Sequence, residues 1–441
     1  MSRRVVITGV GCATPLGTET SAVWSNLVAG RSGIGPITLF DASQFPIRIA
    51  AEVDNLHQAD FGDSHIDWQT HPRQTRFAVT SAVQAVRAAG IEPGGVNPTR
   101  LGVYLGCGEI FWDLSQFGPM MARAIENGQL DRRAFFQQAI AQCDGRREEY
   151  NEPNMPSYCL AGLFDAQGPN LNCIAACASS TQAIGGAAEV IRRGEAEVML
   201  AGGAHSMVDP IAVSGLHLLS VLNTDNDRGP AAMRPFDGDR AGFVVGEGGA
   251  VVVLEELQHA RSRGAEILGE LTGFASGHDA YRVTDTHPDG RGYVNCVRQA
   301  LRQAGRNLTD VDYINAHGTS TVMNDRIETL ALKHAFGQHA YRIPVSSTKS
   351  MMGHATTACG ALEMIVALMA VRTGVIPPTI NYEVFDPNCD LDYVPNTARE
   401  IDCRHVLSNS LGFGGQNATI IVSKFDEASS SKSKPAKVTA A

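Results

Sequence analysis

The stretch NCIAACASSTQAIGGAAEVIRRG, residues 172–194, decides the fold of this chain. Its apolar start is typical of a buried strand, and the small and hydroxyl residues that follow Cys177 suit the first turn of a helix. We expect that helix to end at Arg193, because Gly194 is the residue type most often found just past a helix C-terminus. Cys177 therefore lies at the corner between a strand and a helix.

A thiol at a helix start faces unpaired backbone N–H groups and the positive end of the helix dipole. Both favour the thiolate, which is the nucleophilic form of cysteine. The same N–H groups suit the oxyanion that forms when a thiolate attacks a carbonyl. The alternative is a structural cysteine, because free cysteines pack well in apolar cores. Cys159 and Cys173 fit that alternative better than Cys177, but the corner alone leaves the question open.

Outward from this corner, short apolar runs alternate with amphipathic stretches. RVVITGVG, EVMLAGGA and ATIIVSKF are examples of the runs, and TRFAVTSAVQAVRAAG is one of the stretches. The alternation predicts an α/β protein whose sheets are covered by helices. A similar order of strands, motif and helix occurs in residues 1–260 and again in 261–425, so we expect two similar halves.

Two stretches stand apart from this alternation. Residues 109–157 form a polar excursion with several aromatic residues, which we expect to be helical in part and to cap the first half. Residues 426–441 are rich in Ser, Lys and Ala without apolar periodicity, which indicates a disordered tail.

The composition argues against several classes of function. The 441 residues are 44% hydrophobic and carry a net charge of −10 without a long basic run, so nucleic acid is not the expected partner. The first apolar run is too short to cross a bilayer and has no cleavage site, so no membrane or export is expected. Ten scattered cysteines lack zinc or disulfide-framework spacing, which predicts free thiols in a reducing cytosol and no metal site.

A second motif, INAHGTSTVMNDRIE, covers residues 314–328. His317 follows a predicted strand, so its ring is placed to project from the end of a sheet. The alternative for a lone histidine is a hydrogen-bonded structural role. Asp325 and Glu328 lie three positions apart, which suits the start of the helix that follows.

A third motif, VSSTKSMMGHATTACGALE, covers residues 345–363. Lys349 and His354 flank a short turn between a strand and a long apolar helix. Burying an unpaired ammonium group is costly, so a buried Lys349 requires a counter-ion, for which Glu363 and Glu328 are the candidates. The alternative is a lysine on the surface.

A fourth motif, NSLGFGGQNATIIV, covers residues 409–422. Glycines at 412, 414 and 415 allow an unusual backbone path around Phe413, and a movable aromatic ring there can gate a pocket. The alternative is an ordinary turn before the last strand. The glycines of 234–257 lie between strands rather than between a strand and a helix, so we infer no dinucleotide site.

Together these motifs resemble the β-ketoacyl-acyl carrier protein synthases, the condensing enzymes of thiolase fold. RRVVITGVG, ACASSTQAIGGA, RPFDGDRAGFVVGEG, INAHGTSTVMNDRIE, SSTKSMMGHATTACGALE and SNSLGFGGQN occur in the order of that family over about residues 3–424. The resemblance implies a five-layered αβαβα fold of two similar halves. It also implies a decarboxylative Claisen condensation of an acyl chain with malonyl-acyl carrier protein, in type II fatty acid or polyketide biosynthesis.

The resemblance also implies a role for each motif. Cys177 is the nucleophile that holds the acyl chain as a thioester. His317 and His354 hydrogen-bond the malonyl thioester oxygen as loss of the carboxylate leaves an enolate, and Lys349 supports the site electrostatically. The backbone N–H groups of Cys177 and Phe413 form the oxyanion hole, and Phe413 gates the pocket. The supporting residues are Glu363, Asp325, Glu328, Gly414 and Gly415.

Such a reaction needs no metal and no redox cofactor, because loss of carbon dioxide drives it. The substrates arrive on the phosphopantetheine arm of an acyl carrier protein, whose acidic surface requires a basic patch on this chain. The resemblance implies a dimer, either of two identical chains or of this chain with a subunit like a chain-length factor.

Three departures from the family pattern bear on the substrate. Arg282 stands where the ketosynthases of type II polyketide systems often have histidine. Asn324 stands before Asp325 where the fatty-acid enzymes have glycine, which favours the ketosynthases of type II polyketide systems. In GCGEIFWDL, either Glu109 or Ile110 occupies the position of an apolar residue of the acyl pocket. We interpret these departures as signs of an unusual chain length or a specialised pathway.

Two rival interpretations involve other families of this fold: a non-catalytic partner subunit and a condensing enzyme that does not decarboxylate. Chain-length factors are non-catalytic partner subunits that lack the nucleophilic cysteine, whereas Cys177 is present here. Thiolases and 3-hydroxy-3-methylglutaryl-CoA synthases do not decarboxylate, and thiolases use a second active-site cysteine. Cys359 and Cys389 are only loose candidates for that second cysteine, and the TKSMMGH stretch argues against a thiolase.

Overall fold

A computed structural model describes residues 3–54, 56–62, 66–111 and 114–427. Ten strands hydrogen-bond in the order β12-β11-β15-β16-β10-β1-β9-β8-β4-β7. The strands of the first half are β1 (Val5–Ala13), β4 (Leu101–Cys107), β7 (Asn170–Asn172), β8 (Val198–His205) and β9 (Gly248–Glu256). Those of the second half are β10 (Gly269–His278), β11 (Tyr313–Asn315), β12 (Val345–Ser346), β15 (His405–Gly412) and β16 (Gln416–Ser423). The predicted disordered tail, 426–441, lies outside the described residues from 428 onward.

The two halves repeat one pairing pattern. In the first half, β1 is antiparallel to β9 and β9 to β8, whereas β8, β4 and β7 are parallel. In the second half, β10 is antiparallel to β16 and β16 to β15, whereas β15, β11 and β12 are parallel. The two sets join where β1 pairs with β10. Because both sets of strands share this pairing order, the structure has the two similar halves that we expected.

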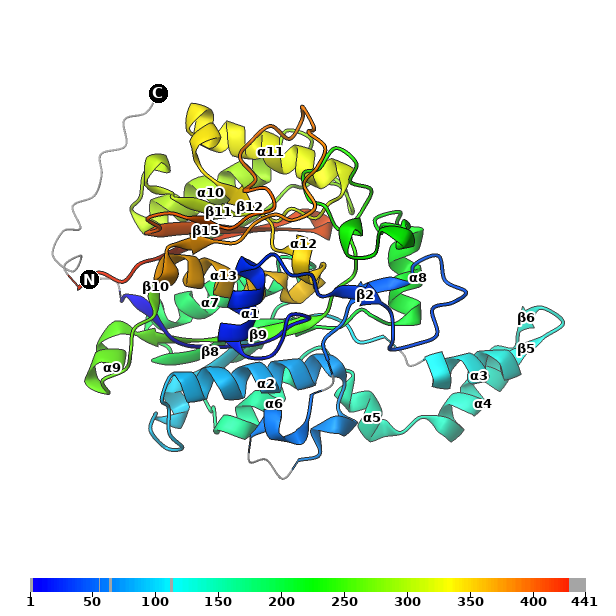
Figure 1. Ribbon diagram of the computed structural model, residues 1–441. Helices are drawn as coiled ribbons and strands as arrows, with labels where there is room; N and C mark the ends of the chain where they lie inside the picture. Colours follow the sequence, from blue (N-terminus) through cyan, green and yellow to red (C-terminus); the bar gives the residue numbers. More distant parts are fainter. Residues whose placement is uncertain (1–2, 55, 63–65, 112–113, 428–441) are drawn as a thin grey trace.

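Helices complete the five layers of the expected αβαβα fold (Figure 1). The outer face of the first set carries α2 (Arg73–Ala88) and α6 (Met155–Phe164), and that of the second set carries α10 (Arg291–Ala304) and α11 (Val322–Phe336). The middle layer consists of α7 (Ser179–Arg193) and α13 (Cys359–Thr373), which contact each other and both sets of strands.

The middle layer explains the long apolar helix of the third motif. The segment Thr356–Thr373 is long and apolar enough to cross a membrane, and 83% of it is buried inside the protein. A helix that packs between two sheets must be apolar on almost every face, because it meets a sheet on each side. The length and hydropathy of this segment therefore match its place in the core.

Shorter elements connect the layers. They are α1 (Thr20–Val28), β2 (Ile34–Pro36), β3 (Ile49–Ala51), α8 (Pro210–Leu218), α9 (Leu257–Ser262), α12 (Lys349–Met352), β13 (Val375–Ile376) and β14 (Arg399–Glu400).

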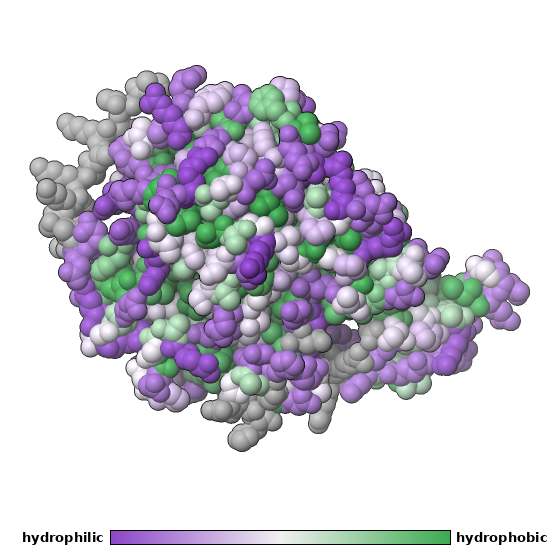
Figure 2. All heavy atoms as spheres, viewed as in Figure 1, coloured by the Kyte–Doolittle hydropathy of each residue, from purple (hydrophilic) through white to green (hydrophobic). Residues whose placement is uncertain are grey.

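Segment 109–157, which we expected to be partly helical and to cap the first half, contains an arm. The arm comprises α3 (Leu114–Ala124), β5 (Ile125–Glu126), β6 (Gln129–Leu130), α4 (Arg132–Gln142) and α5 (Gly145–Tyr150). In Figure 1 α3, α4 and the β5–β6 hairpin extend beyond the five layers. Phe117 meets Phe135 edge to face at 5.9 Å, and no residue of α4 is buried. Figure 2 shows apolar side chains on the surface of the arm.

Candidate active site

The corner at Cys177 is a turn, not the end of the buried strand that we expected: β7 stops at Asn172, five positions earlier, and none of its residues is buried. Helix α7 ends at Arg193, and Gly194 follows in the left-handed conformation, as predicted. Ala176 has φ of +47°, a strained value for a residue other than glycine. The Ser179 hydroxyl accepts the N–H of Ala175 at 2.8 Å and donates to the Ala176 carbonyl at 2.6 Å. These two bonds brace the turn that presents the thiol.

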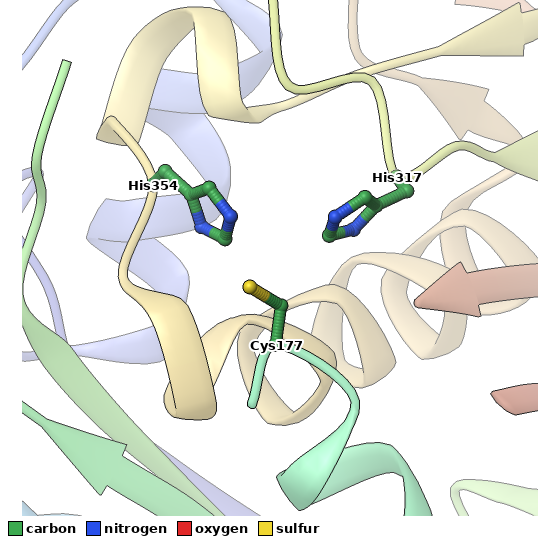
Figure 3. A group of neighbouring side chains, drawn as sticks. All are labelled: Cys177, His317 and His354. Carbon is green, nitrogen blue, oxygen red and sulfur yellow. The ribbon is translucent and has the colours of Figure 1, made fainter. Parts of the chain in front are cut away.

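Three predicted site residues converge at this corner (Figure 3). Cys177 precedes α7, His317 follows β11, and His354 follows α12. One side-chain atom from each, sulfur or ring nitrogen, lies within 4.8 Å of the others, and all three side chains are buried. The two imidazole centroids are 5.4 Å apart with their planes at 84°. The structure therefore brings together residues that are 140 and 37 positions apart in sequence.

Of the two acidic residues that we expected at the start of the helix, Asp325 lies in its first turn, whereas Glu328 lies further along it. Helix α11 begins earlier, at Val322, with Thr321 as its N-cap. Glu328 accepts the backbone N–H groups of His317 at 2.8 Å and Gly318 at 2.7 Å, so it fixes the loop that carries His317. Burial raises the pKa of Glu328 to about 7.

Asp325 braces a neighbouring loop. Its carboxylate accepts the N–H groups of Phe236 at 2.8 Å and Ser320 at 3.2 Å, and it lies 3.5 Å from Nε of Arg240. Burial raises the pKa of Asp325, although the charge of Arg240 opposes that shift. Both acidic residues thus support the site through main-chain contacts.

Lys349 is buried, and its counter-ion is Glu363 rather than Glu328. The ammonium group forms an ion pair with Glu363 in which each side chain is 2% exposed. It also donates to the His317 carbonyl at 2.6 Å and lies 3.4 Å from His317 Nδ1. Burial opposes the charge of Lys349, but the facing carboxylate of Glu363 raises the pKa of Lys349. A permanent positive charge therefore stands behind His317.

The hydrogen bonds indicate the tautomers of both histidines. Lys349 can only donate, so His317 Nδ1 is the acceptor and Nε2 carries the hydrogen. His354 Nδ1 accepts the N–H of Thr356 at 3.1 Å and faces Cys359 Sγ at 3.0 Å, so its Nε2 also carries the hydrogen. Burial, followed by the charge of Lys349, lowers the pKa of both rings well below the ordinary value. Both are therefore neutral N–H donors.

The resting thiol differs from the sequence-based expectation of a thiolate. Burial raises the pKa of Cys177 to about 11. The charge of Lys349 and the backbone N–H groups of Phe413 and Cys177 act in the opposite direction, but burial outweighs them. The two N–H groups that face the sulfur are the two predicted for the oxyanion hole.

Gly412 allows the Phe413 loop to approach this corner. A Cβ at Gly412 would lie 2.8 Å from the Ala175 carbonyl oxygen and 3.1 Å from the Cys177 nitrogen, so a side chain there would push the loop away. Gly414 and Gly415 have φ of 77° and 78°, which confirms the unusual backbone path predicted for the fourth motif.

A cavity of about 480 Å³ contains Cys177, both histidines and Phe413 in its wall. Thr284, Asp285, Thr286, Thr321, Val322, Met323 and Asn324 also border it. Glu109 borders the same cavity, whereas Ile110 borders a neighbouring cavity of about 390 Å³. Of the two residues that the sequence left open, Glu109 is thus the one in the wall of the cavity that contains the thiol.

Cys177, His317 and His354 are also the one group of three possible metal ligands found in the described part of the chain. A sulfur with two imidazole nitrogens is a donor set that zinc accepts. The charge of Lys349, 3.4 Å from His317 Nδ1, opposes a cation at this place. The expectation that the site uses no metal stays a prediction.

Sequence reasoning missed His205, Thr356 and Thr357, which also border the cavity. His205 is the last residue of β8, so its place at a strand end was the available signal. Its Nδ1 pairs with the Thr356 hydroxyl, and its Nε2 lies 3.1 Å from the Glu109 carbonyl oxygen. The two threonines lie within the third motif, but their residue type gave no sign that they border the cavity.

Comparison with known proteins agrees with this geometry. Residues 2–260 match the family described as beta-ketoacyl synthase, N-terminal domain, and residues 268–383 match its C-terminal domain. The chain is 42% identical over 424 residues to a 3-oxoacyl-acyl-carrier-protein synthase 2 of Coxiella burnetii, which covers 96% of this chain and 99% of that protein. It is 41% identical over 423 residues to the tetracenomycin polyketide synthase ketoacyl synthase alpha subunit of Streptomyces glaucescens, with 95% and 97% covered.

Solved structures agree as well. A type II polyketide synthase acyl carrier protein in complex with its hexaketide-bound ketosynthase (AntDE:AntF) matches with a TM-score of 0.84 at 30% identity, over 97% of this chain and 100% of that one. The ishigamide ketosynthase/chain length factor matches with a TM-score of 0.84 at 32% identity, over the same shares. With both family domains matched and relatives above 40% identity over nearly the whole chain, this protein belongs to the beta-ketoacyl synthase family.

Proposed function

We propose that Cys177 receives an acyl chain from an acyl carrier protein and that the site then condenses it with a malonyl unit. The observation that carries this proposal is the convergence of one thiol and two N–H-donating imidazoles within 4.8 Å, with a buried ammonium group behind them. In the first step the sulfur attacks the acyl thioester carbonyl, and the backbone N–H groups of Cys177 and Phe413 hold the oxyanion. The pantetheine thiolate leaves and takes up the thiol proton.

In the second step the malonyl thioester loses carbon dioxide. The electron pair of the broken carbon–carbon bond passes into an enolate, whose oxygen accepts hydrogen bonds from Nε2 of His317 and His354. Lys349 favours this negative charge, because its ammonium group is buried 3.4 Å from His317 Nδ1. The enolate carbon attacks the acyl thioester on Cys177, and collapse of the oxyanion releases the thiolate, which takes a proton from solvent.

This reaction balances without a metal or a redox cofactor, so we propose none beyond the phosphopantetheine arm of the carrier. The halves 1–260 and 261–425 act as one catalytic unit, because the first supplies Cys177 and the second supplies both histidines. Ten free thiols suit a reducing cytosol, which is the proposed location.

The carrier protein is the proposed partner at the cavity entrance. A ketosynthase with its acyl carrier protein and a ketosynthase with a chain length factor are among the solved structures that this chain resembles. Exposed Arg282 and Arg326 lie two positions from the cavity-lining residues Thr284 and Asn324. They are the proposed basic contacts for an acidic carrier surface.

The assembly is proposed to be a dimer, with either an identical chain or a chain-length-factor-like subunit. Molar mass in solution, measured with this chain alone, decides between the two. A purely non-catalytic partner role is disfavoured, because a chain-length factor lacks the cysteine that stands here between two histidines.

The test is the intact mass of the protein after incubation with acyl-acyl carrier proteins, followed by product analysis with malonyl-acyl carrier protein. We expect an acyl adduct that is lost in Cys177→Ala and kept in Cys173→Ala, a matched control four positions earlier on the same segment. A wild-type protein that takes no acyl chain and forms no 3-oxoacyl product contradicts the proposal.

A further inference from the structure

Cys359 is a second buried thiol close to the site, and none of the steps proposed above uses it. Its sulfur lies 3.0 Å from Nδ1 of His354, whose ring converges with Cys177 and His317 in Figure 3. Cys359 is 3% exposed and, unlike Cys177 and His354, does not border the cavity of about 480 Å³ in the described part of the chain. The thiol therefore contacts the histidine but not the space for the substrate.

The thiol is the donor in this contact. Nδ1 of His354 also accepts the backbone N–H of Thr356 at 3.1 Å, so Nδ1 carries no hydrogen and Cys359 must donate its S–H. Burial keeps the thiol protonated, because it raises the pKa of Cys359 well above its ordinary value, and the charge of Lys349 only partly opposes that shift. His354 Nδ1 therefore has two donors, which confine the ring hydrogen to Nε2.

The second donor depends on a strained backbone. Thr356 has φ of +45°, a value that β-branched residues rarely adopt, and its hydroxyl donates to Nδ1 of His205. Nε2 of His205 lies 3.1 Å from the Glu109 carbonyl oxygen, which can only accept, so Nε2 carries the hydrogen and Nδ1 is the acceptor. His205 thus holds Thr356 in the conformation in which its N–H meets His354. Backbone strain of this kind in an active site is a sign that the strained residue serves the site.

We propose that Cys359 is a positioning residue for His354, and that it shares this role with Thr356. Each donates to Nδ1, so each opposes the other tautomer, in which Nδ1 carries the hydrogen and Nε2 presents a lone pair to the enolate. That lone pair would repel the negative oxygen that His354 is proposed to stabilise. The inference rests on the proposed function, to which it adds the groups that fix the donor.

The test compares Cys359→Ser, which keeps a hydrogen-bond donor, with Cys359→Ala, which removes it. Both variants are made in the wild-type chain and in a Thr356→Val chain, which keeps the shape of the side chain but lacks the hydroxyl that His205 accepts. Release of carbon dioxide from malonyl-acyl carrier protein is measured for all four proteins. We expect Cys359→Ala to be about threefold slower than Cys359→Ser in the wild-type chain and about tenfold slower in the Thr356→Val chain, losses of the size that one hydrogen bond accounts for.

Two further measurements separate positioning from a general loss of structure. Acylation of Cys177, followed by intact mass, should be nearly equal in Cys359→Ser and Cys359→Ala, because neither step of that reaction uses His354 as a donor. Nitrogen NMR of protein labelled at its histidine rings should show His354 with its hydrogen on Nε2 in the wild type and in Cys359→Ser. The double variant Cys359→Ala, Thr356→Val should show a mixture of the two tautomers. The signals of His354 are assigned by their absence from His354→Ala.

Cys403→Ala is the matched control. It removes a thiol that is also 3% exposed but forms no hydrogen bond to a site histidine among the described residues. Both the release of carbon dioxide and the signals of His354 should stay as they are in the wild type.

The inference is overturned if Cys359→Ala and Cys359→Ser decarboxylate equally fast in the Thr356→Val chain, or if His354 keeps its hydrogen entirely on Nε2 in the double variant. A wild type that releases no carbon dioxide and forms no 3-oxoacyl product would instead contradict the proposed function. The NMR comparison decides the positioning role in that case too, because it requires no turnover.

Discussion

Lys349 and Glu363 form an ion pair inside the protein, with each side chain 2% exposed. The pair links two helices, because Lys349 begins α12 and Glu363 lies in the first turns of α13. The same ammonium group donates to the His317 carbonyl at 2.6 Å. One buried charge thus connects the middle layer of the fold to the loop that carries a site histidine.

Removal of one partner from this pair should destabilise the fold. Glu363→Gln leaves the ammonium group of Lys349 without a compensating charge in a dry environment, so we expect the free energy of unfolding to fall by about 3–5 kcal/mol. Urea unfolding followed by circular dichroism measures the change. Glu195→Gln breaks the exposed ion pair with Arg193 and should leave the unfolding midpoint where it is. A Glu363→Gln protein as stable as the wild type would contradict a charged pair.

Glu328 should make stability depend on pH. Its pKa is raised by burial from 4.5 to about 7, so the folded state binds a proton that the unfolded state has already lost. The stabilisation by this group is therefore complete below pH 4.5 and declines as the pH rises through 7. Over that range the stability advantage of the wild type over Glu328→Gln should shrink by up to roughly 3 kcal/mol. Urea unfolding at several pH values measures both proteins, and two parallel curves would show that the carboxyl group titrates normally.

The two chemical steps should separate in a histidine variant. His354→Ala removes an N–H donor to the enolate but leaves the thiol and both oxyanion-hole groups, so malonyl decarboxylation should fall by about 10²–10³-fold. Acylation of Cys177, followed by intact mass, should change only a few-fold. His334→Ala, at an exposed histidine near the end of α11, serves as the control. Equal losses in both steps would place His354 in the acylation step too.

Replacement of Gly412 should impair the site through a steric clash of the added side chain, not through backbone strain. Its φ of −115° is open to any residue, but a Cβ would meet the Ala175 oxygen at 2.8 Å and the Cys177 nitrogen at 3.1 Å. Gly412→Ala should therefore displace the Phe413 N–H and slow acylation of Cys177 by about 10²-fold, as small misplacements at a reacting centre do. Gly35→Ala, where nothing lies within 4 Å of the added Cβ, is the matched control. An unchanged acylation rate would exclude Phe413 from the oxyanion hole.

Local patterns predicted helix α7 correctly but not the buried strand before it, since β7 is short and has no buried residue. The start of α7 after Cys177 and its end at Gly194 follow from residue types within one stretch of chain, and the structure confirms both. The two counter-ion candidates for Lys349 could not be separated in the same way, because Glu363 and Glu328 come near it only through the packing of α13 and α11. The structure assigns Glu363 to the ammonium group and Glu328 to the backbone of the His317 loop.

Other features of the site could not be predicted from the sequence, because they depend on the folded structure. The helix start does favour a thiolate, but how much burial opposes it depends on the layers above and below Cys177, and these form only in the folded chain. Thr357 could not be found either, because its place beside the cavity depends on how distant segments of the chain pack together. The roles of the site residues remain predictions, which the variants above test.

The order in which the chain is made has a consequence for its chemistry. Cys177 belongs to the first half, while the loop with Phe413, whose N–H faces that thiol, comes 236 positions later, after β15, the last strand but one. A growing chain thus contains its nucleophile long before the second oxyanion donor, the N–H of Phe413, has been synthesised. A chain that ends before Phe413 lacks one of the two backbone groups that face the thiol.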